Sequence, residues 1–315
     1  MQAAPLYEDI ANAPSGGQAF FVKAEDGTRI RFALWQGGAR GLALVFPGRS
    51  ECVEKYGRLA GRLQERGFAV LVIDWRGQGL SDRLNNSTSV GHVDYFSDYQ
   101  QDIKAALSHP DVAAIKGPRV LFAHSMGGCI GLRALLTRQD IAAAVFSAPM
   151  WGLHLPLANA LLAPLLASFG VALGIGKKSV FGQPKGFYLT RAAFKGNNLT
   201  HDPEYWDYMR NQILLYPALA LGPPSYIWLK SAFSEFKYFE TQAMPDIPSL
   251  SFVGSDEAIV SAEAIRRLIA RFPSGTHKEI NAARHEIWME TPDKQQQCWS
   301  AIDAFLSTSL PEPSG

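Results

Sequence analysis

The stretch RVLFAHSMGGCIGLRALL, residues 119–136, decides the fold of this chain. Its first residues are apolar and favour a β-strand, a tight turn follows around Ser125, and a helical pattern continues to Leu136. A strand, a sharp turn carrying a serine and an immediate helix are the setting of a nucleophile elbow. The elbow strains the serine backbone and lifts its Oγ clear of the sheet. The stretch therefore predicts that Ser125 is a nucleophile, with a helix N-terminus facing the negative charge that develops.

Small side chains flank this serine, as an elbow requires. Residues two before and two after the nucleophile would collide with the neighbouring strand and helix unless they are small, and here they are Ala123 and Gly127. The first position is usually glycine, so alanine is a departure that still meets the steric demand. The alternative is a buried serine in a Gly-rich turn between a core strand and a core helix, so the rest of the chain must decide between the two.

Length and composition bound the answer. With 315 residues and 47% hydrophobic residues, the chain suits one large α/β domain, or one domain with a sizeable insertion. A formal charge of +1 gives no reason to expect nucleic acid as a partner. Cys52, Cys129 and Cys298 are odd in number and far apart, which argues against a disulfide framework and fits a reducing compartment. Residues 1–18 have no signal-peptide pattern, so we expect a polar arm and a cytoplasmic protein.

The chain alternates strands with helices on either side of a middle block. An Asp-Gly pair within residues 19–36 predicts a hairpin. Further strands are expected at 42–46, 68–73, 119–123, 142–146, 250–253 and 277–280, and helices before residue 66 and at 95–107, 262–272 and 292–306. This alternation predicts an α/β fold with a mostly parallel central sheet and helices on both faces. It stops within residues 150–240, which we interpret as a mainly helical cap inserted between two core parts, residues 1–149 and 241–315.

Four predicted strand ends carry residues suited to catalysis. The loop after the strand at 42–46 can present a backbone amide to the serine, so Arg49 N–H and Met126 N–H are our candidates for the oxyanion hole. The alternative for this loop is a plain strand-to-helix turn. The loop at 74–82 contains Gly-x-Gly without a third glycine, so it does not predict a dinucleotide site, and we interpret it as architectural.

The last two strand ends supply an acid and a base. We expect Asp256 as the acid, with Glu257 as the competing carboxylate and Asp246 as a weaker one; a surface turn is the alternative. Of the seven histidines, only His285 lies in the loop between the last strand and the last helix. The chain order Ser125, Asp256, His285 is that of the α/β-hydrolases. His285-Glu286 also begins an H-E-x-x-H pattern, but Met289 occupies the final position, so the zinc-protease alternative fails.

These motifs resemble the monoglyceride lipase and bacterial lysophospholipase branch of the α/β-hydrolases, which is grouped with serine aminopeptidase-like hydrolases. The resemblance runs from about residue 20 to residue 306, and its segments are PGRSE (47–51), DWRGQGLS (74–81), HSMGG (124–128), NLTHD (198–202), PALALGPP (217–224), GSD (254–256) and HE (285–286). The P-G-R-x-E form is similar to the bacterial lysophospholipases, whereas monoglyceride lipases have H-G-x-x-E.

The resemblance implies a serine esterase that needs no cofactor and cleaves the carboxylic ester of a single-chain lipid, first of all a lysophospholipid. A monoacylglycerol lipase, a small-molecule carboxylesterase, a serine aminopeptidase-like peptidase and a catalytically silent binding protein are the alternatives. A peptidase would need an anionic anchor for the free amine of its substrate, and the cap sequence shows no cluster of carboxylates. A silent binder predicts damage to the triad, yet Ser125, Asp256 and His285 are all present.

The cap contains an apolar stretch, residues 157–176, that is long enough to be considered as a membrane span. Its place between two parts of one catalytic domain argues against a span, so we expect it to line an acyl-chain tunnel or to dip into the membrane interface. No Asp or Glu occurs from 141 to 201, while cations do: Lys177, Lys178, Lys185, Arg191 and Lys195. Peripheral contact with anionic membrane and a solvated basic face are equal alternatives for these cations.

Overall fold

A nine-stranded sheet forms the centre of the molecule in the computed structural model, which describes residues 2–182 and 186–310. The spatial order of the strands is β1-β2-β3-β5-β4-β6-β7-β8-β9. Their bounds are β1 Gln2–Ala4, β2 Gln18–Lys23, β3 Arg29–Trp35, β4 Gly41–Phe46, β5 Phe68–Asp74, β6 Arg119–His124, β7 Ala143–Ser147, β8 Ser249–Gly254 and β9 Gly275–Ile280. The predicted strands are therefore all present, and β2 and β3 form the antiparallel hairpin expected from residues 19–36.

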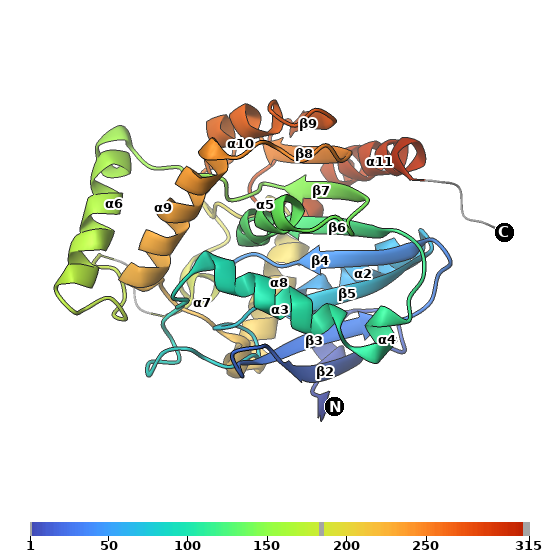
Figure 1. The fold of residues 1–315 in the computed structure, drawn as a ribbon, viewed down its shortest axis with the longest axis horizontal. Coiled ribbons are helices and arrows are strands. Elements are labelled where there is room, and N and C mark those ends of the chain that lie inside the picture. Colours follow the sequence, from blue (N-terminus) through green and yellow to red (C-terminus); the bar gives the residue numbers. More distant parts are fainter. Residues whose placement is uncertain (1, 183–185, 311–315) are drawn as a thin grey trace.

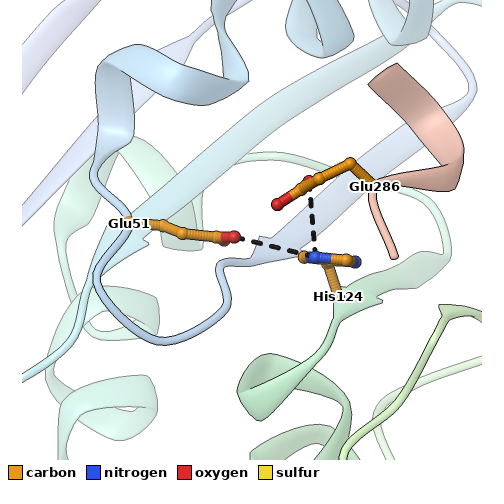
Figure 2. Close-up of side chains that lie close together, drawn as sticks. All are labelled: Glu51, His124 and Glu286. Carbon is orange, nitrogen blue, oxygen red and sulfur yellow. Dashed lines mark ion pairs between the residues drawn. The ribbon is translucent and has the colours of Figure 1, made fainter. Parts of the chain in front are cut away.

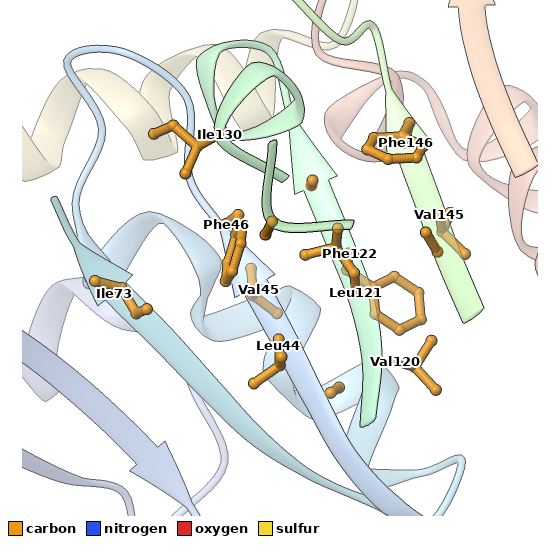
Figure 3. Close-up of a cluster of buried hydrophobic side chains, with 14 of the residues drawn as sticks. Leu44, Val45, Phe46, Ile73, Val120, Leu121, Phe122, Ile130, Val145 and Phe146 are labelled. Atoms are coloured by element: carbon orange, nitrogen blue, oxygen red, sulfur yellow. The ribbon is translucent and has the colours of Figure 1, made fainter. Parts of the chain in front are cut away.

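The sheet is parallel from β5 to β9 and antiparallel from β1 to β3, with β3 running antiparallel to β5. Every residue of β4, β5, β7 and β8 is buried, because helices cover both faces of a parallel sheet. Side chains of β4, β6 and β7 pack together at the centre of this core (Figure 3). This confirms the mostly parallel α/β prediction.

The helices of the core lie in two layers. α3 and α5 contact each other in front of the sheet in Figure 1, and α2 lies behind it, where Arg62 of α2 donates to Gln295 of α11 at 2.8 Å. The helices are α1 Glu8–Ala11, α2 Gly57–Gln64, α3 Tyr99–Leu107, α4 Pro110–Ala113, α5 Met126–Thr137, α10 Ala262–Ile269 and α11 Pro292–Ser309, with 3-10 turns η1 Val53–Tyr56, η2 Phe96–Asp98 and η4 Ile287–Met289. α2, α3, α10 and α11 match the predicted helices to within a few residues.

The N-terminal arm differs from the prediction. We expected residues 1–18 to be a polar arm, but β1 pairs with β2 and α1 packs against η1. Tyr7 stacks on Tyr216, and the hydroxyl of Tyr208 donates to the Ala11 carbonyl at 2.8 Å. These contacts come from residues about 200 positions away, so no local pattern in the arm could have indicated them.

The segment between β7 and β8 contains several helices, and we continue to call residues 150–240 the cap. These helices are α6 Leu157–Ala172, α7 Tyr188–Arg191, α8 Pro203–Leu215, η3 Pro217–Leu219 and α9 Tyr226–Thr241. α6 and α9 lie side by side at one end of the molecule, beyond the carboxyl ends of the parallel strands (Figure 1). Within the described ranges, no helix has the length and apolarity that crossing a membrane requires.

Candidate active site

Ser125 has the strained backbone of a nucleophile elbow. It joins β6 to α5 with φ 50° and ψ −118°, a conformation that a residue with a Cβ rarely adopts. Two hydrogen bonds hold it there: its amide donates to the Ser147 carbonyl at 3.1 Å, and its carbonyl accepts from Met150 N at 2.8 Å. The end of β7 therefore stabilises the strain in the turn that follows β6.

Both small residues beside the serine are explained by close contacts. A Cβ at Gly127 would lie 2.0 Å from the carbonyl oxygen of Phe46, so no other residue fits there without moving β4. Ala123 lies in β6 between Phe46 of β4 and Phe146 of β7. A Cβ at Gly131 of α5 would come within 3.3 Å of the Ala123 Cβ, so alanine fits the space while a larger side chain would press on α5.

The two predicted oxyanion amides have no acceptor among the described residues. Within the described residues, neither Arg49 N–H nor Met126 N–H donates to an acceptor of the chain. The loop that carries Arg49 is fixed on both sides of it, because Gly48 N–H donates to Glu51 and Gln78 Nε2 donates to the Gly48 carbonyl at 2.8 Å. The loop at 74–82, which contains Gln78, therefore braces the site as the architectural interpretation predicted.

His285 pairs with a carboxylate in the loop after β8. Its Nδ1 lies 2.8 Å from Glu257 Oε2, and both side chains are buried. The other carboxylate oxygen of Glu257 accepts from Ile259 N at 2.7 Å and from Val260 N at 3.1 Å. Burial alone would raise the pKa of Glu257, but His285 and these amides hold it below its ordinary value. The acid is thus ionised and oriented.

The same pair changes the proton affinity of the histidine. Burial alone would lower the pKa of His285, but the neighbouring carboxylates, Glu257 first among them, raise it above its ordinary value. An imidazole with a raised pKa and a fixed Nδ1–H partner is oriented to take up a proton at Nε2. This is the arrangement of base and acid that a serine nucleophile requires.

The structure corrects the predicted acid. The side chain of Asp256 is half exposed, and its carboxylate lies 3.8 Å from Nε2 of His201, while Glu257 contacts His285. The physical reason is the turn after β8: the Asp256 amide donates to the Ala283 carbonyl at 3.0 Å, which places its side chain on the surface. The competing carboxylate of the sequence argument therefore occupies the acid's position, and Asp246 instead accepts a hydrogen bond from Ser274.

The cap contacts the loop that carries the histidine. Glu286 N–H donates to the Leu199 carbonyl at 2.8 Å, and Thr200 Oγ1 donates to the Met289 carbonyl at 2.7 Å. His201 Nδ1 lies 3.0 Å from Glu290 Oε1. The NLTHD segment, residues 198–202, thus fixes the position of the His285 loop, a role that the sequence did not reveal.

Comparisons with known proteins agree with this geometry. Residues 37–292 match the family model described as "Serine aminopeptidase, S33". The chain is 29% identical over 277 residues to the protein named "Probable lysophospholipase L2" of Haemophilus influenzae, covering 86% of this chain and 85% of that protein. It is 28% identical over 294 residues to "Lysophospholipase L2" of Escherichia coli K12, covering 87% and 82%.

Solved structures show the same fold. A soluble variant of the monoglyceride lipase of Saccharomyces cerevisiae is similar with a TM-score of 0.70 at 22% identity, covering 92% of this chain and 94% of that one. A carboxyl esterase of Bacillus coagulans is similar with a TM-score of 0.72 at 16% identity, covering 94% and 99%. The chain belongs to the serine aminopeptidase S33 family of the α/β-hydrolases.

Proposed function

We propose that this protein is a serine hydrolase that cleaves the carboxylic ester of single-chain lipids, first of all lysophospholipids. The observation that carries the chemistry is the strained Ser125 at the end of β6, together with the buried His285–Glu257 pair in the loops after β9 and β8. The substrate class is supported by the two relatives named as lysophospholipases, which this chain matches over most of their length.

The proposed mechanism proceeds through an acyl-enzyme. Ser125 Oγ attacks the ester carbonyl while Nε2 of His285 takes its proton, and Glu257 stabilises the imidazolium. The amides of Arg49 and Met126 bind the oxyanion of the tetrahedral intermediate, and losing one such donor typically costs about 3–4 kcal/mol. His285 then gives the proton to the leaving glycerol oxygen. Water attacks the acyl-enzyme by the same steps and releases the fatty acid.

Three of the five carboxylates in the cap are already paired with cations, which weakens the case for a peptide substrate. A peptidase of this kind needs an unpaired carboxylate to bind the free amine of its substrate. Three cap glutamates are each bound to an arginine instead: Glu204 to Arg58, Glu235 to Arg133 and Glu240 to Arg267. These side chains therefore offer no free anionic anchor.

The side chain of Arg49 suits a phosphate headgroup. The partly exposed guanidinium of Arg49 lies 5.2 Å from the Trp228 ring and donates to the Gly222 carbonyl. Within the described residues its charge has no carboxylate within 4.0 Å, and its Nε has no hydrogen-bond partner. Burial lowers the pKa of Arg49 to about 10, which still leaves it charged at neutral pH. We propose that it binds the phosphate of a lysophospholipid.

Helix α6 gives the protein a lipid-facing surface. Six large apolar side chains on or just after it are more than half exposed: Leu161, Leu162, Leu165, Leu166, Phe169 and Leu173. A patch of this kind marks an interaction surface. Exposed Lys177 and Lys178 follow it directly, so we propose that it rests on anionic membrane, with the protein peripheral to the bilayer from the cytoplasmic side. Lys185, the third predicted cation, lies outside the described residues.

Matched substrates test the proposed function. 1-Oleoyl-lysophosphatidylcholine and 1-monoolein carry the same acyl chain, and short p-nitrophenyl esters carry no lipid chain. We expect Ser125-dependent hydrolysis of the lysophospholipid at the highest kcat/KM, abolished in Ser125→Ala. If only the short esters are hydrolysed, and that hydrolysis depends on Ser125, the proposed catalytic triad would be supported and the proposed lipid substrate would be rejected. No serine-dependent turnover of any ester would reject the hydrolase proposal.

Two arginine variants test the headgroup. Because a hydrogen bond to a charged group contributes about 1.5–3 kcal/mol, Arg49→Met should lower the ratio of lysophosphatidylcholine to monoolein kcat/KM by about ten-fold or more. Arg83 is the matched control, because its guanidinium donates to four backbone carbonyls and, among residues 2–182 and 186–310, to no carboxylate. We expect Arg83→Met to leave the ratio unchanged. An unchanged ratio in Arg49→Met would reject the phosphate contact.

A further inference from the structure

A buried group of charged side chains lies behind the site, and the proposed mechanism does not use it. Glu51, Lys55, His124 and Glu286 are each less than a tenth exposed. Lys55 Nζ lies 2.5 Å from Glu51 Oε1 and 2.6 Å from Glu286 Oε1, so one ammonium bridges two carboxylates. Burial alone would lower the pKa of Lys55, but these carboxylates raise it, so the bridge is ionic.

His124 completes this group from the end of β6 (Figure 2). Its Nδ1 lies 3.0 Å from the Ser147 carbonyl, which can only accept, so Nδ1 carries a proton. Its Nε2 lies 3.4 Å from Glu286 Oε2 and 3.6 Å from Glu51 Oε1. The imidazole thus faces the same two carboxylates as Lys55.

The group is an ion-pair cluster and not a metal centre. One carboxylate oxygen each from Glu51 and Glu286 and one nitrogen of His124 are close enough together to hold a metal ion. The carboxylates are already bridged by the Lys55 ammonium at hydrogen-bond distance. A divalent cation would have to displace this charge or lie against it, so the cluster's own cation is the lysine.

Each carboxylate of the cluster belongs to a loop that carries a catalytic group. Glu51 accepts hydrogen bonds from Gly48 N–H and from the Tyr56 hydroxyl, which fixes the loop that carries the Arg49 amide. Glu286 directly follows the base, His285, in the chain. His124 directly precedes the nucleophile. The cluster therefore connects the loops after β4, β6 and β9.

We propose that Glu51, Lys55 and Glu286 are positioning residues for the reaction: their ion pairs hold the Arg49 amide and the His285 ring in register with Ser125. This inference rests on the proposed function, because it assigns a task to the same triad. A displacement of about 1 Å at a reacting group can cost about a hundred-fold in rate. A link between loops that are 231 residues apart in the chain would prevent such a displacement.

The cluster also sets the charge around the base. Glu257, Glu286 and Glu51 raise the pKa of His285 against the effect of burial, and the His124 ring lies 4.8 Å from the His285 ring. Burial alone would raise the pKa of Glu286, but Lys55 and His124 hold it well below its ordinary value, so Glu286 is ionised. The carboxylates of the cluster favour the imidazolium form, and Lys55 partly neutralises them.

Opposite pH shifts follow from removing either charge of the Lys55–Glu286 pair. The base must be neutral to accept the serine proton, so kcat/KM falls as the pH drops through the pKa of His285. Glu286→Gln removes a negative charge, lowers that pKa and moves the acidic limb of the pH profile to lower pH. Lys55→Met leaves the carboxylates unneutralised, raises that pKa and moves the limb to higher pH.

The experiment measures kcat, KM and the acidic limb on a p-nitrophenyl ester for Glu286→Gln, Lys55→Met, the double variant and Lys55→Arg. We expect both single variants to lose about ten-fold or more in kcat with little change in KM, and to shift the limb in opposite directions. The double variant should return the acidic limb towards its wild-type pH. Lys55→Arg keeps the positive charge, so its acidic limb should stay at the wild-type pH. Lys294→Met is the control for the position of the limb, because Lys294 is also buried and pairs with Glu290, which is not among the carboxylates named above as raising the pKa of His285. It is not a control for kcat, since Glu290 also contacts His201 and the Arg284 amide.

Shifts in the same direction, or no shift in either variant, would overturn the proposal even if kcat fell. If Lys55→Met does not fold, the comparison of Glu286→Gln with Lys55→Arg still tests the proposal, because only Glu286→Gln should move the acidic limb. Titration of the His285 ring signal by NMR gives the same shifts without turnover. Opposite NMR shifts in an enzyme that hydrolyses no ester would support the positioning role and reject the proposed function.

Discussion

At the scale of single residues, one carboxylate of an adjacent pair orients the base: Glu257 pairs with His285, and Asp256 lies half exposed beside it. Asp256 and Glu257 are adjacent carboxylates after a late strand, and chain order alone cannot say which one turns inward. The tertiary contact that decides it is the bond from the Asp256 amide to the Ala283 carbonyl. The sequence did contain a local signal. Glu257 precedes Ile259 by two residues and Val260 by three, and at this spacing its carboxylate can accept hydrogen bonds from both backbone amides, as it does in the structure.

The first prediction concerns these two carboxylates. Glu257→Gln should lower kcat by about 10³-fold or more, because an amide cannot stabilise the imidazolium and favours the wrong tautomer of the base. Asp256→Asn should leave kcat within about two-fold, since its side chain is half exposed. Steady-state rates on a p-nitrophenyl ester check both, with circular dichroism to show that the variants fold. The reverse ranking would return the acid to Asp256.

At the scale of elements, the strands and helices of the core were predictable because each carries its own pattern. β4 and β6 are short apolar runs, and α5 begins directly after the elbow. The sequence could not predict α1, which packs against α8 about 200 residues away, nor the ion pair between Lys55 and Glu286, which joins residues 231 positions apart. Elements that form through distant contacts leave no local pattern to read.

The turn between β6 and α5 gives the second prediction. Gly127→Ala places a Cβ where the Phe46 carbonyl stands, so it should destabilise the fold by more than about 3 kcal/mol. Ala123→Gly adds only backbone freedom and should cost about 1 kcal/mol. Urea unfolding measures both free energies. Equal losses in the two variants would contradict the close contact between the turn and β4.

Helix α6 gives the third prediction. Burying one leucine in the membrane interface stabilises binding by about 1.5–3 kcal/mol, so Leu165→Glu with Phe169→Glu should lower binding to vesicles with anionic phosphatidylglycerol by at least about a hundred-fold. Leu215→Glu is the matched control, because Leu215 is equally exposed but lies on α8. Co-sedimentation measures binding. Equal losses in both variants, or no vesicle binding by the wild type, would reject α6 as the contact surface.

At the scale of the whole molecule, the fold brings together residues from both ends of the chain. The parallel strands place the loops after β4, β6, β8 and β9 at one edge of the sheet, where Arg49, Ser125, Glu257 and His285 gather. The cap contacts the histidine loop through residues 198–202, so the end of the molecule that carries α6 and α9 is joined to the base. This arrangement follows from the order of elements, which the sequence predicted, and from cap contacts, which it did not.

The most direct test of the account is covalent labelling of the nucleophile. A fluorophosphonate reacts with a serine only when a base activates it and an oxyanion hole accepts the charge. We expect intact-mass spectrometry to show one adduct per chain, peptide mapping to place it on Ser125, and Ser125→Ala and His285→Ala to remove it. An unlabelled wild-type chain, or an adduct that persists in Ser125→Ala, would contradict the assignment of Ser125 as the nucleophile.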